Sequence, residues 1–229
     1  MFLLELDRLL RPGGYWILSG PPIRYESMWK GWDKSFEEYK AEYEGITRMA
    51  EAMGWKKVAE WRKSAVWQKP LNHDDLAGRK EGEYPQFCDD KDDADIGWYA
   101  PLKNCQTRMP EPVGEGETSG GAVEAWPKRA HATPPRVASG QQKGLSVEQF
   151  RAEEKRWAER MAFYKARLLP RFAQGGYRNI MDMNAGQGAF AANLLKEAVW
   201  VMNVMPPQSK VDTLGVIFER GLIGIYHDW

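Results

Sequence analysis

The feature that most constrains the fold is a glycine-rich turn at residues 182–188, Asp-Met-Asn-Ala-Gly-Gln-Gly. The residues before it, 179–182, predict a short strand, and those after it, 189–196, have helical spacing. A glycine turn between a strand and the helix that follows lets the backbone approach a ligand closely. The sequence therefore predicts an α/β domain whose first strand ends at a ligand-binding turn.

The segments after this turn repeat the alternation of strand and helix. Strands are predicted at 199–204 and 222–226, with a helix at 212–219 between them. The order strand–helix–strand–helix–strand is typical of a parallel sheet whose strands are joined by crossover helices. The chain ends at Trp229, where we expect only half of such a sheet to be built.

A long amphipathic helix is predicted before the turn, over about residues 146–169. Ser146 and Gln149 form a capping box at its start. Ser35 and Glu38 give the same signal for an earlier helix. The apolar face of the later helix consists of Phe150, Trp157, Met161, Tyr164 and Leu168.

The first seventy residues have a different order of elements. In chain order, the predictions are a helix (2–10), a turn (11–14), a buried strand (15–19), a helix from Ser35 to Gly54, and two strands (55–61 and 64–68). Only Arg62 and Lys63 separate the last two strands, which predicts an antiparallel pair.

Residues 71–145 are predicted to be an irregular connection between two domains, at 1–70 and 146–229. The first part of this connection is polar, and the second part is rich in Pro, Gly and Ser. Residues 114–121 have the composition of a flexible segment. The predicted anchors of the connection are two pairs, Trp98-Tyr99 and Trp126-Pro127.

The charges of the chain are balanced, with 32 Lys plus Arg against 32 Asp plus Glu. Because such a chain has no surplus of positive charge for a phosphate backbone, we do not expect nucleic acid as a partner. No apolar run reaches the roughly 18 residues that suggest a membrane span. Glu5 and Asp7 interrupt the first apolar stretch, so residues 1–20 do not predict a signal peptide.

The chain has two cysteines, Cys88 and Cys105, and three histidines. The cysteines are not spaced as zinc ligands, so no metal site is predicted. They form either two free thiols or one disulfide across a short polar loop, and the choice depends on the redox compartment.

The glycine turn admits three interpretations: a site for S-adenosylmethionine, a site for a dinucleotide, and a tight turn that binds nothing. Gly186, Gly188 and Ala191 fit the dinucleotide pattern G-x-G-x-x-A. That pattern expects an acid about 20 residues later to bind ribose, whereas residues 201–205 contain none. Asp182 leads the turn as in methyltransferases, and amides at a helix start favour a carboxylate. S-adenosylmethionine is therefore the favoured ligand.

Five longer motifs resemble those of one plant family. They are LRPGGYWILSGPP (10–22), WPKR followed by PPR (126–136), MDMNAGQGAFAA (181–192), VWVMNV (199–204) and ERGLIGIYHDW (219–229). With these motifs the chain resembles the plant S-adenosylmethionine-dependent methyltransferases that include the Golgi, pectin-related quasimodo-type proteins. The resemblance covers most of residues 1–110 and 145–229.

This resemblance implies a fold class and a location. Family members carry two methyltransferase-like domains behind a single membrane anchor, on the lumenal side of the Golgi membrane. The implied fold class is α/β, with partial Rossmann-like class I methyltransferase domains. Residues 1–70 would be the C-terminal part of one, residues 146–229 the N-terminal part of a second, and residues 71–145 the irregular linker. We expect the anchor to lie outside this chain.

Six residues are predicted to bind S-adenosylmethionine: Asp182, Asn184, Gly186, Gly188, Asn203 and Asp228. Asp182 would hold the methionine end of the cofactor, or else it caps the following helix as a strand-end acid. The two glycines would allow close backbone approach, or else they serve turn geometry alone.

The other three predicted cofactor-binding residues are polar. Two of them depart from common methyltransferase patterns, and the third has a simpler structural explanation. Asn184 stands where many methyltransferases have Gly, and Asn tolerates left-handed geometry better than most residues. Asn203 stands where a ribose-binding acid is expected, and its amide can bond a hydroxyl more weakly. Asp228 would face adenine, or else it is a solvated loop acid.

The predicted function is methyl transfer to a cell-wall polysaccharide, and pectic homogalacturonan is the acceptor that the resemblance implies. No general base is assigned, and a carboxylate acceptor needs none because it is already ionised at neutral pH. A non-catalytic methyltransferase-like scaffold is the alternative, favoured by Asn184 and Asn203. A nicotinamide-dependent oxidoreductase is a third hypothesis, and it predicts NAD binding. The sequence does not fix the catalytic residues or the oligomeric state.

Overall fold

The structure is a computed structural model that describes residues 2–76, 84–92, 101–112, 117–168 and 176–229. It divides into two compact units, Met1–Gly121 (unit 1) and Ala122–Trp229 (unit 2), which are described separately. The division lies inside the predicted connection at 71–145.

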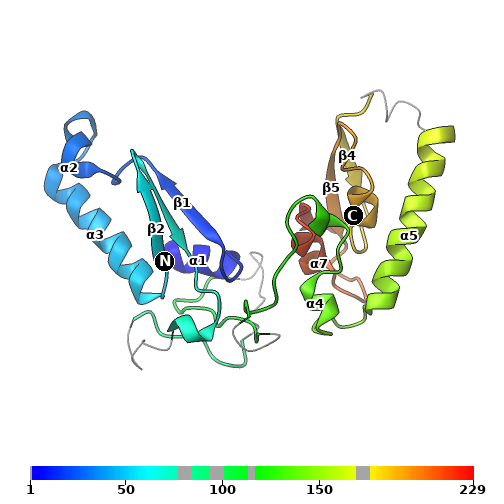
Figure 1. Cartoon of the computed structure of the whole chain (residues 1–229), viewed down its shortest axis with the longest axis horizontal. Coiled ribbons are helices and arrows are strands. Elements are labelled where there is room, and N and C mark those ends of the chain that lie inside the picture. The colour runs from blue at the N-terminus through cyan, green and yellow to red at the C-terminus, as the bar shows by residue number, and fades with distance from the viewer. Residues whose placement is uncertain (1, 77–83, 93–100, 113–116, 169–175) are drawn as a thin grey trace. The chain divides into compact units, whose positions relative to one another are not determined.

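Unit 1 is a three-stranded antiparallel sheet with helices on one face (Figure 1). Its elements are α1 (Phe2–Leu9), β1 (Tyr15–Ser19), α2 (Tyr25–Met28), η1 (Trp29–Gly31), α3 (Phe36–Ala52), β2 (Lys56–Trp61), β3 (Ser64–Gln68) and η2 (His73–Leu76). The strand order is β1-β3-β2, which confirms the antiparallel pair predicted at 55–61 and 64–68. The capping box of Ser35 and Glu38 at the start of α3 is also present.

The core of unit 1 lies between the sheet and the helices α1 and α3. Leu4 and Met53 pack with Trp55 and Trp67 in one buried cluster. The prediction of a buried strand at 15–19 is wrong, because three of its five residues, Tyr15, Ile17 and Ser19, are exposed and the other two are only partly buried. Since the helices cover one face only, alternate residues of β1 face solvent.

A buried polar cluster joins α1 to the end of β3 in unit 1. The Oδ1 atom of Asp7 accepts a hydrogen bond of 2.7 Å from the indole of Trp55. Lys69 Nζ donates to the carbonyl oxygens of Asp7 (2.5 Å) and Leu10 (3.1 Å). Burial lowers the pKa of Lys69, and the carboxylate of Asp7 opposes this shift. The cluster therefore holds an opposite charge beside each buried ion.

The first part of the predicted connection packs into unit 1. Cys88 and Cys105 form a disulfide with a Cα–Cα distance of 5.0 Å. Beside it, Gln106 is buried, and its Nε2 donates to the carbonyl oxygen of Met53 (3.1 Å). Trp98-Tyr99 and residues 114–116 lie outside the described residues, so the predictions made for them are not tested.

Unit 2 is an α/β unit with a three-stranded parallel sheet in the order β4-β5-β6 (Figure 1). Its elements are η3 (Lys128–Ala130), α4 (Pro135–Ala138), α5 (Val147–Phe163), the π-helical turn η4 (Tyr164–Leu168), β4 (Asn179–Asp182), α6 (Ala189–Ala192), β5 (Trp200–Met205), α7 (Leu214–Glu219) and β6 (Gly224–Tyr226). The predicted parallel sheet and its alternating helices are confirmed.

Two helices of unit 2 differ in length from their predictions. The helix predicted at 189–196 is α-helical only to Ala192 and continues as turns. Leu194 N donates to Ala191 O, which tightens the chain to three-residue spacing at this end. The helix predicted at about 146–169 begins with the expected capping box but changes to π-helical spacing at Tyr164.

Helix α5 runs along one face of the unit 2 sheet, as Figure 1 shows. Its predicted apolar face is confirmed for Phe150 and Met161, which are both buried. Met161 packs with Leu194, two residues after the end of α6, and with sheet residues such as Ile180. The side chain of Leu168 lies outside the described residues.

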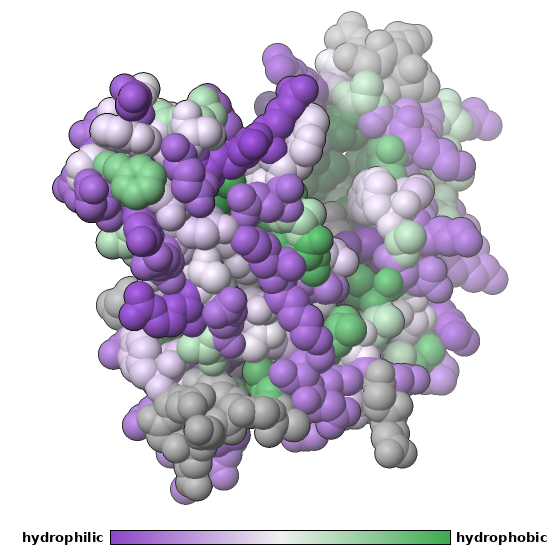
Figure 2. Space-filling view, turned by 60° about the vertical axis from the view of Figure 1, so that its left-hand side comes forward, coloured by the Kyte–Doolittle hydropathy of each residue, from purple (hydrophilic) through white to green (hydrophobic). Residues whose placement is uncertain are grey.

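The surface of the molecule has mixed polarity. On the face drawn in Figure 2, hydrophilic side chains predominate and apolar ones lie in small areas. Within the described residues, no helix combines the length and the apolar character that crossing a membrane requires.

Candidate functional site

The candidate site lies at the carboxyl edge of the unit 2 sheet. Because β4, β5 and β6 are parallel, their carboxyl ends meet at one edge, where open α/β sheets bind ligands. β4 ends at Asp182, which pairs in register with Asn203 of β5. Asn203 in turn pairs with Gly224 of β6. The glycine turn starts from this row of residues.

The two glycines of the turn adopt left-handed backbone conformations, with φ of 53° at Gly186 and 78° at Gly188. A Cβ atom on Gly188 would lie 3.0 Å from Leu222 Cδ1 and 3.3 Å from Ile217 Cγ1. The close approach at Gly188 is therefore to the protein's own side chains. A Cβ atom on Gly186 would instead lie 3.2 Å from a carboxylate oxygen of Glu153.

The backbone carbonyls of the turn already accept hydrogen bonds from within unit 2. Ala185 O accepts from Gly188 N at 2.8 Å, and Gly186 O accepts from the hydroxyl of Thr213. Gln187 O accepts from Arg220 Nη1 at 2.7 Å. By contrast, the amides of Gly186 and Gln187 donate no hydrogen bond within the described residues. The turn therefore has backbone amides that are not hydrogen-bonded in the described part of the chain, whereas the carbonyl oxygens of residues 185–187 are already engaged.

Arg220, at the end of α7, holds the turn from inside the unit. Its guanidinium is fully buried and donates to Gln187 O and Ala130 O, both at 2.7 Å. It also pairs with Glu154 Oε1 at 2.5 Å and lies over the ring of Phe150, 5.1 Å from its centroid. Sequence analysis did not single out Arg220, because only the tertiary structure brings these groups together.

Asp182 and Asn184 lie where the sequence placed them, at the start of the turn. Asp182 is partly buried, and its Oδ1 accepts from the amide of Asn184 at 3.4 Å. Burial raises the pKa of Asp182, while the hydrogen bond from Asn184 lowers it. Asn184 itself is exposed. The carboxylate is thus positioned by the turn and remains partly accessible.

Asn203 is fully buried beneath the turn. Its Nδ2 donates to Ile223 O at 2.7 Å, and its Oδ1 has no hydrogen-bond partner among the described residues. This oxygen lies 3.7 Å from the position of a Cβ atom on Gly188. The side chain of Asn203 therefore links β5 to the segment before β6. Its contact with ribose stays a prediction.

Asp228 lies at the same edge of the sheet, two residues after the end of β6. It is exposed, and its Oδ2 accepts from Gln208 Nε2 at 3.1 Å. Gln208 follows β5, so this bond links the loops after two neighbouring strands. Adenine binding by Asp228 also stays a prediction.

Glu153 of α5 is an acidic residue at the turn that sequence analysis missed. It is half-buried, and its carboxylate makes no hydrogen bond or ion pair within the described residues. Burial raises the pKa of its carboxyl group, against the opposing charges of Arg156 and Arg220. The sequence contained a signal for its position, because the spacing of Phe150, Glu153 and Trp157 places Glu153 on the apolar face of the predicted helix.

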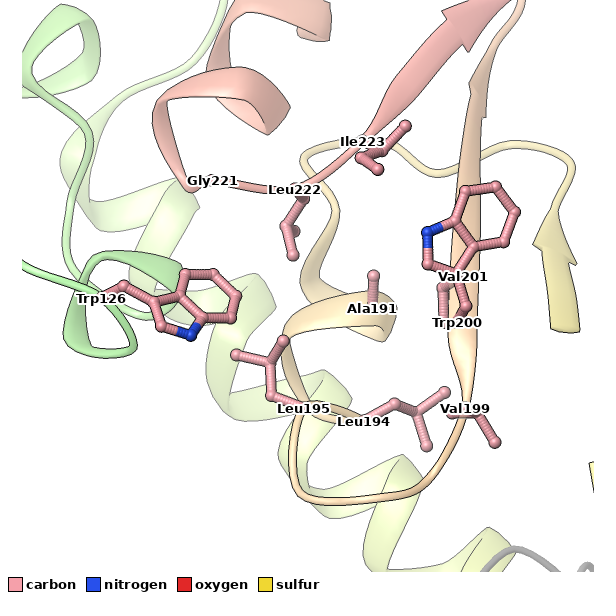
Figure 3. Close-up of a pocket in the computed structure, with 10 residues that line it drawn as sticks. All are labelled: Trp126, Ala191, Leu194, Leu195, Val199, Trp200, Val201, Gly221, Leu222 and Ile223. Atoms are coloured by element: carbon pink, nitrogen blue, oxygen red, sulfur yellow. The ribbon is translucent and has the colours of Figure 1, made fainter. Parts of the chain in front are cut away.

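A pocket with a volume of about 210 Å³ lies elsewhere in unit 2 (Figure 3). The indole rings of Trp126 and Trp200 stand on opposite sides of it, with Leu194, Leu195 and Leu222 among the other lining residues. Trp200 begins β5, so the pocket lies near the amino end of that strand, away from the glycine turn. Its position and its apolar lining do not suit the amino-acid end of a nucleoside cofactor.

Comparison with known proteins identifies one family. A family model described as "Putative S-adenosyl-L-methionine-dependent methyltransferase" matches residues 1–229. No solved structure matches the chain.

Similar proteins occur in Arabidopsis thaliana. The chain is 46% identical over 233 residues to "Probable methyltransferase PMT16" and 43% identical over 231 residues to "Probable methyltransferase PMT15". It is 40% identical over 228 residues to "Probable pectin methyltransferase QUA3". Each match covers 100% of this chain but only 37%, 36% and 35% of the respective relative. The chain therefore spans little more than a third of the length of these relatives.

Proposed function

The chain belongs to the family of S-adenosyl-L-methionine-dependent methyltransferases whose model matches its whole length, and from this premise we propose that unit 2 holds the cofactor at the turn of residues 182–188. One observation carries the proposal: the turn presents unpaired backbone amides beside partly accessible carboxylates. This arrangement is complementary to an amino-acid group, which has a carboxylate and an ammonium.

The residues at the turn fit the amino-acid end of the cofactor. The amides of Gly186 and Gln187, without partners in the described part of the chain, can donate to the cofactor's carboxylate. Asp182 supplies a carboxylate for the ammonium. Arg220 and Thr213 fix the carbonyls of the same turn, so the amides are held in place before the ligand arrives.

The chemistry at the site follows from the cofactor and the acceptor. S-adenosylmethionine supplies a methyl group on a positively charged sulfur. An acceptor oxygen forms the new bond to this methyl carbon while the carbon–sulfur bond breaks, which requires in-line placement. An acidic sugar is ionised at neutral pH, so its carboxylate attacks without a general base.

We propose a cell-wall polysaccharide such as pectic homogalacturonan as the acceptor. Support comes from the motifs shared with the pectin-related family and from the 40% identity to a relative named as a pectin methyltransferase. The same resemblance supports the lumenal side of the Golgi membrane as the location of the longer protein. The disulfide between Cys88 and Cys105 suits an oxidising compartment of this kind.

We also propose that the two units are parts of different class I methyltransferase domains. The helix, turn and strand of residues 2–19, followed by α3 and an antiparallel pair, support a C-terminal part in unit 1. The parallel β4-β5-β6 sheet with its glycine turn supports an N-terminal part in unit 2.

Calorimetric titration of the chain with S-adenosylmethionine and its demethylated product tests the cofactor site. We expect saturable binding that Asp182→Ala weakens by about tenfold or more, since a charged hydrogen-bond partner is lost. NAD serves as the negative control, and NAD binding in place of S-adenosylmethionine would favour an oxidoreductase. The acceptor is tested with the full natural protein, by transfer of labelled methyl groups to homogalacturonan of low and of complete esterification.

A non-catalytic scaffold is the second candidate function. It is favoured by Asn203, which stands where a ribose-binding acid is expected but is buried and donates its amide to Ile223 O. A well-folded chain that binds neither S-adenosylmethionine nor its product would support this candidate.

A further inference from the structure

The ammonium of an amino-acid ligand has few acceptors left at the turn. The carbonyls of Ala185, Gly186 and Gln187 each accept a hydrogen bond from another group of unit 2. The Oδ1 atom of Asp182 accepts from the amide of Asn184. The other carboxylate oxygen of Asp182 accepts none within the described residues, so Asp182 can take the ammonium on one side, and a second unengaged anionic group beside the turn can take it on the other.

Glu153 is that group. Its Oε1 atom lies 3.2 Å from the position that a Cβ atom on Gly186 would occupy, so it borders the space that the missing side chain leaves. Its neighbour Glu154 is engaged, because it pairs with Arg220 at 2.5 Å. Glu153 has no such partner in the described chain, although the charges of Arg156 and Arg220 act on it.

A half-buried carboxylate without a partner is costly to keep in a folded protein. Burial raises the pKa of Glu153, which is the expected sign of this cost. The cost falls when a ligand brings a positive charge to the carboxylate. An ammonium beside Gly186 would supply this charge, and the cofactor's own carboxylate would lie toward the unpaired amides of the turn.

We propose that Glu153 is a cofactor-binding residue whose carboxylate receives the α-ammonium of S-adenosylmethionine across Gly186. The site would then hold the zwitterionic end of the cofactor between α5 and the glycine turn. This inference rests on the proposed function and extends it to a residue outside the strand–turn–helix motif.

The test uses Glu153→Gln, which keeps the shape of the side chain and removes its charge. Calorimetric titration at pH 7.5 compares two ligands: S-adenosylhomocysteine, and its analogue with hydrogen in place of the α-ammonium. We expect Glu153→Gln to weaken the binding of S-adenosylhomocysteine by about tenfold or more. The affinity for the analogue should stay unchanged. Glu159→Gln, at an exposed position of the same helix, is the matched control and should bind both ligands as the parent chain does.

A stability measurement separates binding from structure. Because the carboxylate of Glu153 makes no hydrogen bond or ion pair in the described chain, Glu153→Gln should unfold at the same temperature as the parent chain or at a higher one. Unchanged affinity for S-adenosylhomocysteine, or an equal loss for both ligands, would overturn the role of Glu153 while leaving the proposed function intact. Failure of the parent chain to bind S-adenosylhomocysteine would overturn both.

Discussion

Both units contain a three-stranded sheet and a buried charged side chain, yet they use this charge differently. In unit 1, Asp7 and Lys69 bond Trp55 and backbone carbonyls, so the cluster serves the packing of α1 on the sheet. In unit 2, Arg220 bonds the carbonyl of Gln187 and thereby fixes a turn at an open sheet edge. The comparison indicates that a buried ion can either close a core or fix the backbone of a turn at the edge of a sheet.

Removal of the buried charges should have the largest effects. Arg220→Met removes the buried cation that pairs with Glu154, leaving Glu154 only its contact with His131, and frees two carbonyls, and Asp7→Ala leaves Lys69 without its counter-ion. Each change should destabilise its own unit by about 3–5 kcal/mol, since a buried charge is left uncompensated. Hydrogen exchange of peptides from α3 and α5 reports the two units separately.

Cofactor affinity should distinguish these two variants. Arg220→Met should lose S-adenosylmethionine binding even where the unit remains folded, because the turn is no longer fixed. Asp7→Ala should bind as the parent chain does. Loss of binding in a folded Asp7→Ala protein would contradict the assignment of the site to unit 2 alone.

Two glycines with the same φ of 78° allow a smaller and sharper comparison. Gly188→Ala strains the backbone and crowds Leu222, and Gly54→Ala in unit 1 does the same beside Leu76. Each should cost about 2–4 kcal/mol, from the left-handed conformation and from overpacking. Urea unfolding measures this cost, and calorimetry should show weaker cofactor binding for Gly188→Ala only. Equal binding by both variants would show that the geometry of Gly188 is not needed for the cofactor.

The smallest expected effect is a dependence of cofactor affinity on pH. Burial raises the pKa of Asp182 and of Glu153 from the ordinary value of each carboxyl, and an ammonium requires the ionised forms. Affinity should therefore fall as the pH falls through these raised values, by up to about tenfold per pH unit for each group that must ionise. Titrations from pH 7.5 to 4.5 measure it.

The contribution of these carboxyls to the stability of unit 2 should depend on pH in the opposite direction to the cofactor affinity. A raised pKa means that the folded unit 2 holds the proton more tightly than the unfolded chain. Its free energy of unfolding should thus decrease as the pH rises from the ordinary carboxyl pKa to the raised value. Glu153→Gln should reduce this slope, whereas an unchanged slope would indicate that Glu153 ionises normally.

Local elements of this protein were largely predictable from its sequence. The capping boxes of Ser35 and Ser146, the antiparallel pair of unit 1 and the parallel order of unit 2 follow from short-range patterns, and the structure confirms them. Exposure was less predictable. The apolar run of β1 predicted a buried strand, but Ile17 is 62% exposed because no described helix covers its face.

Sequence alone determined the turn itself: Asp182, Gly186 and Gly188 specify a strand end and a left-handed backbone, because these properties depend on neighbouring residues. Only the tertiary structure decided which distant groups meet there. It brought Glu153 and Arg220 to the turn, buried Asn203 beneath it, and placed Gln106 in the core of unit 1. Such contacts depend on how helices pack on a sheet, which the spacing of residues along the chain does not specify.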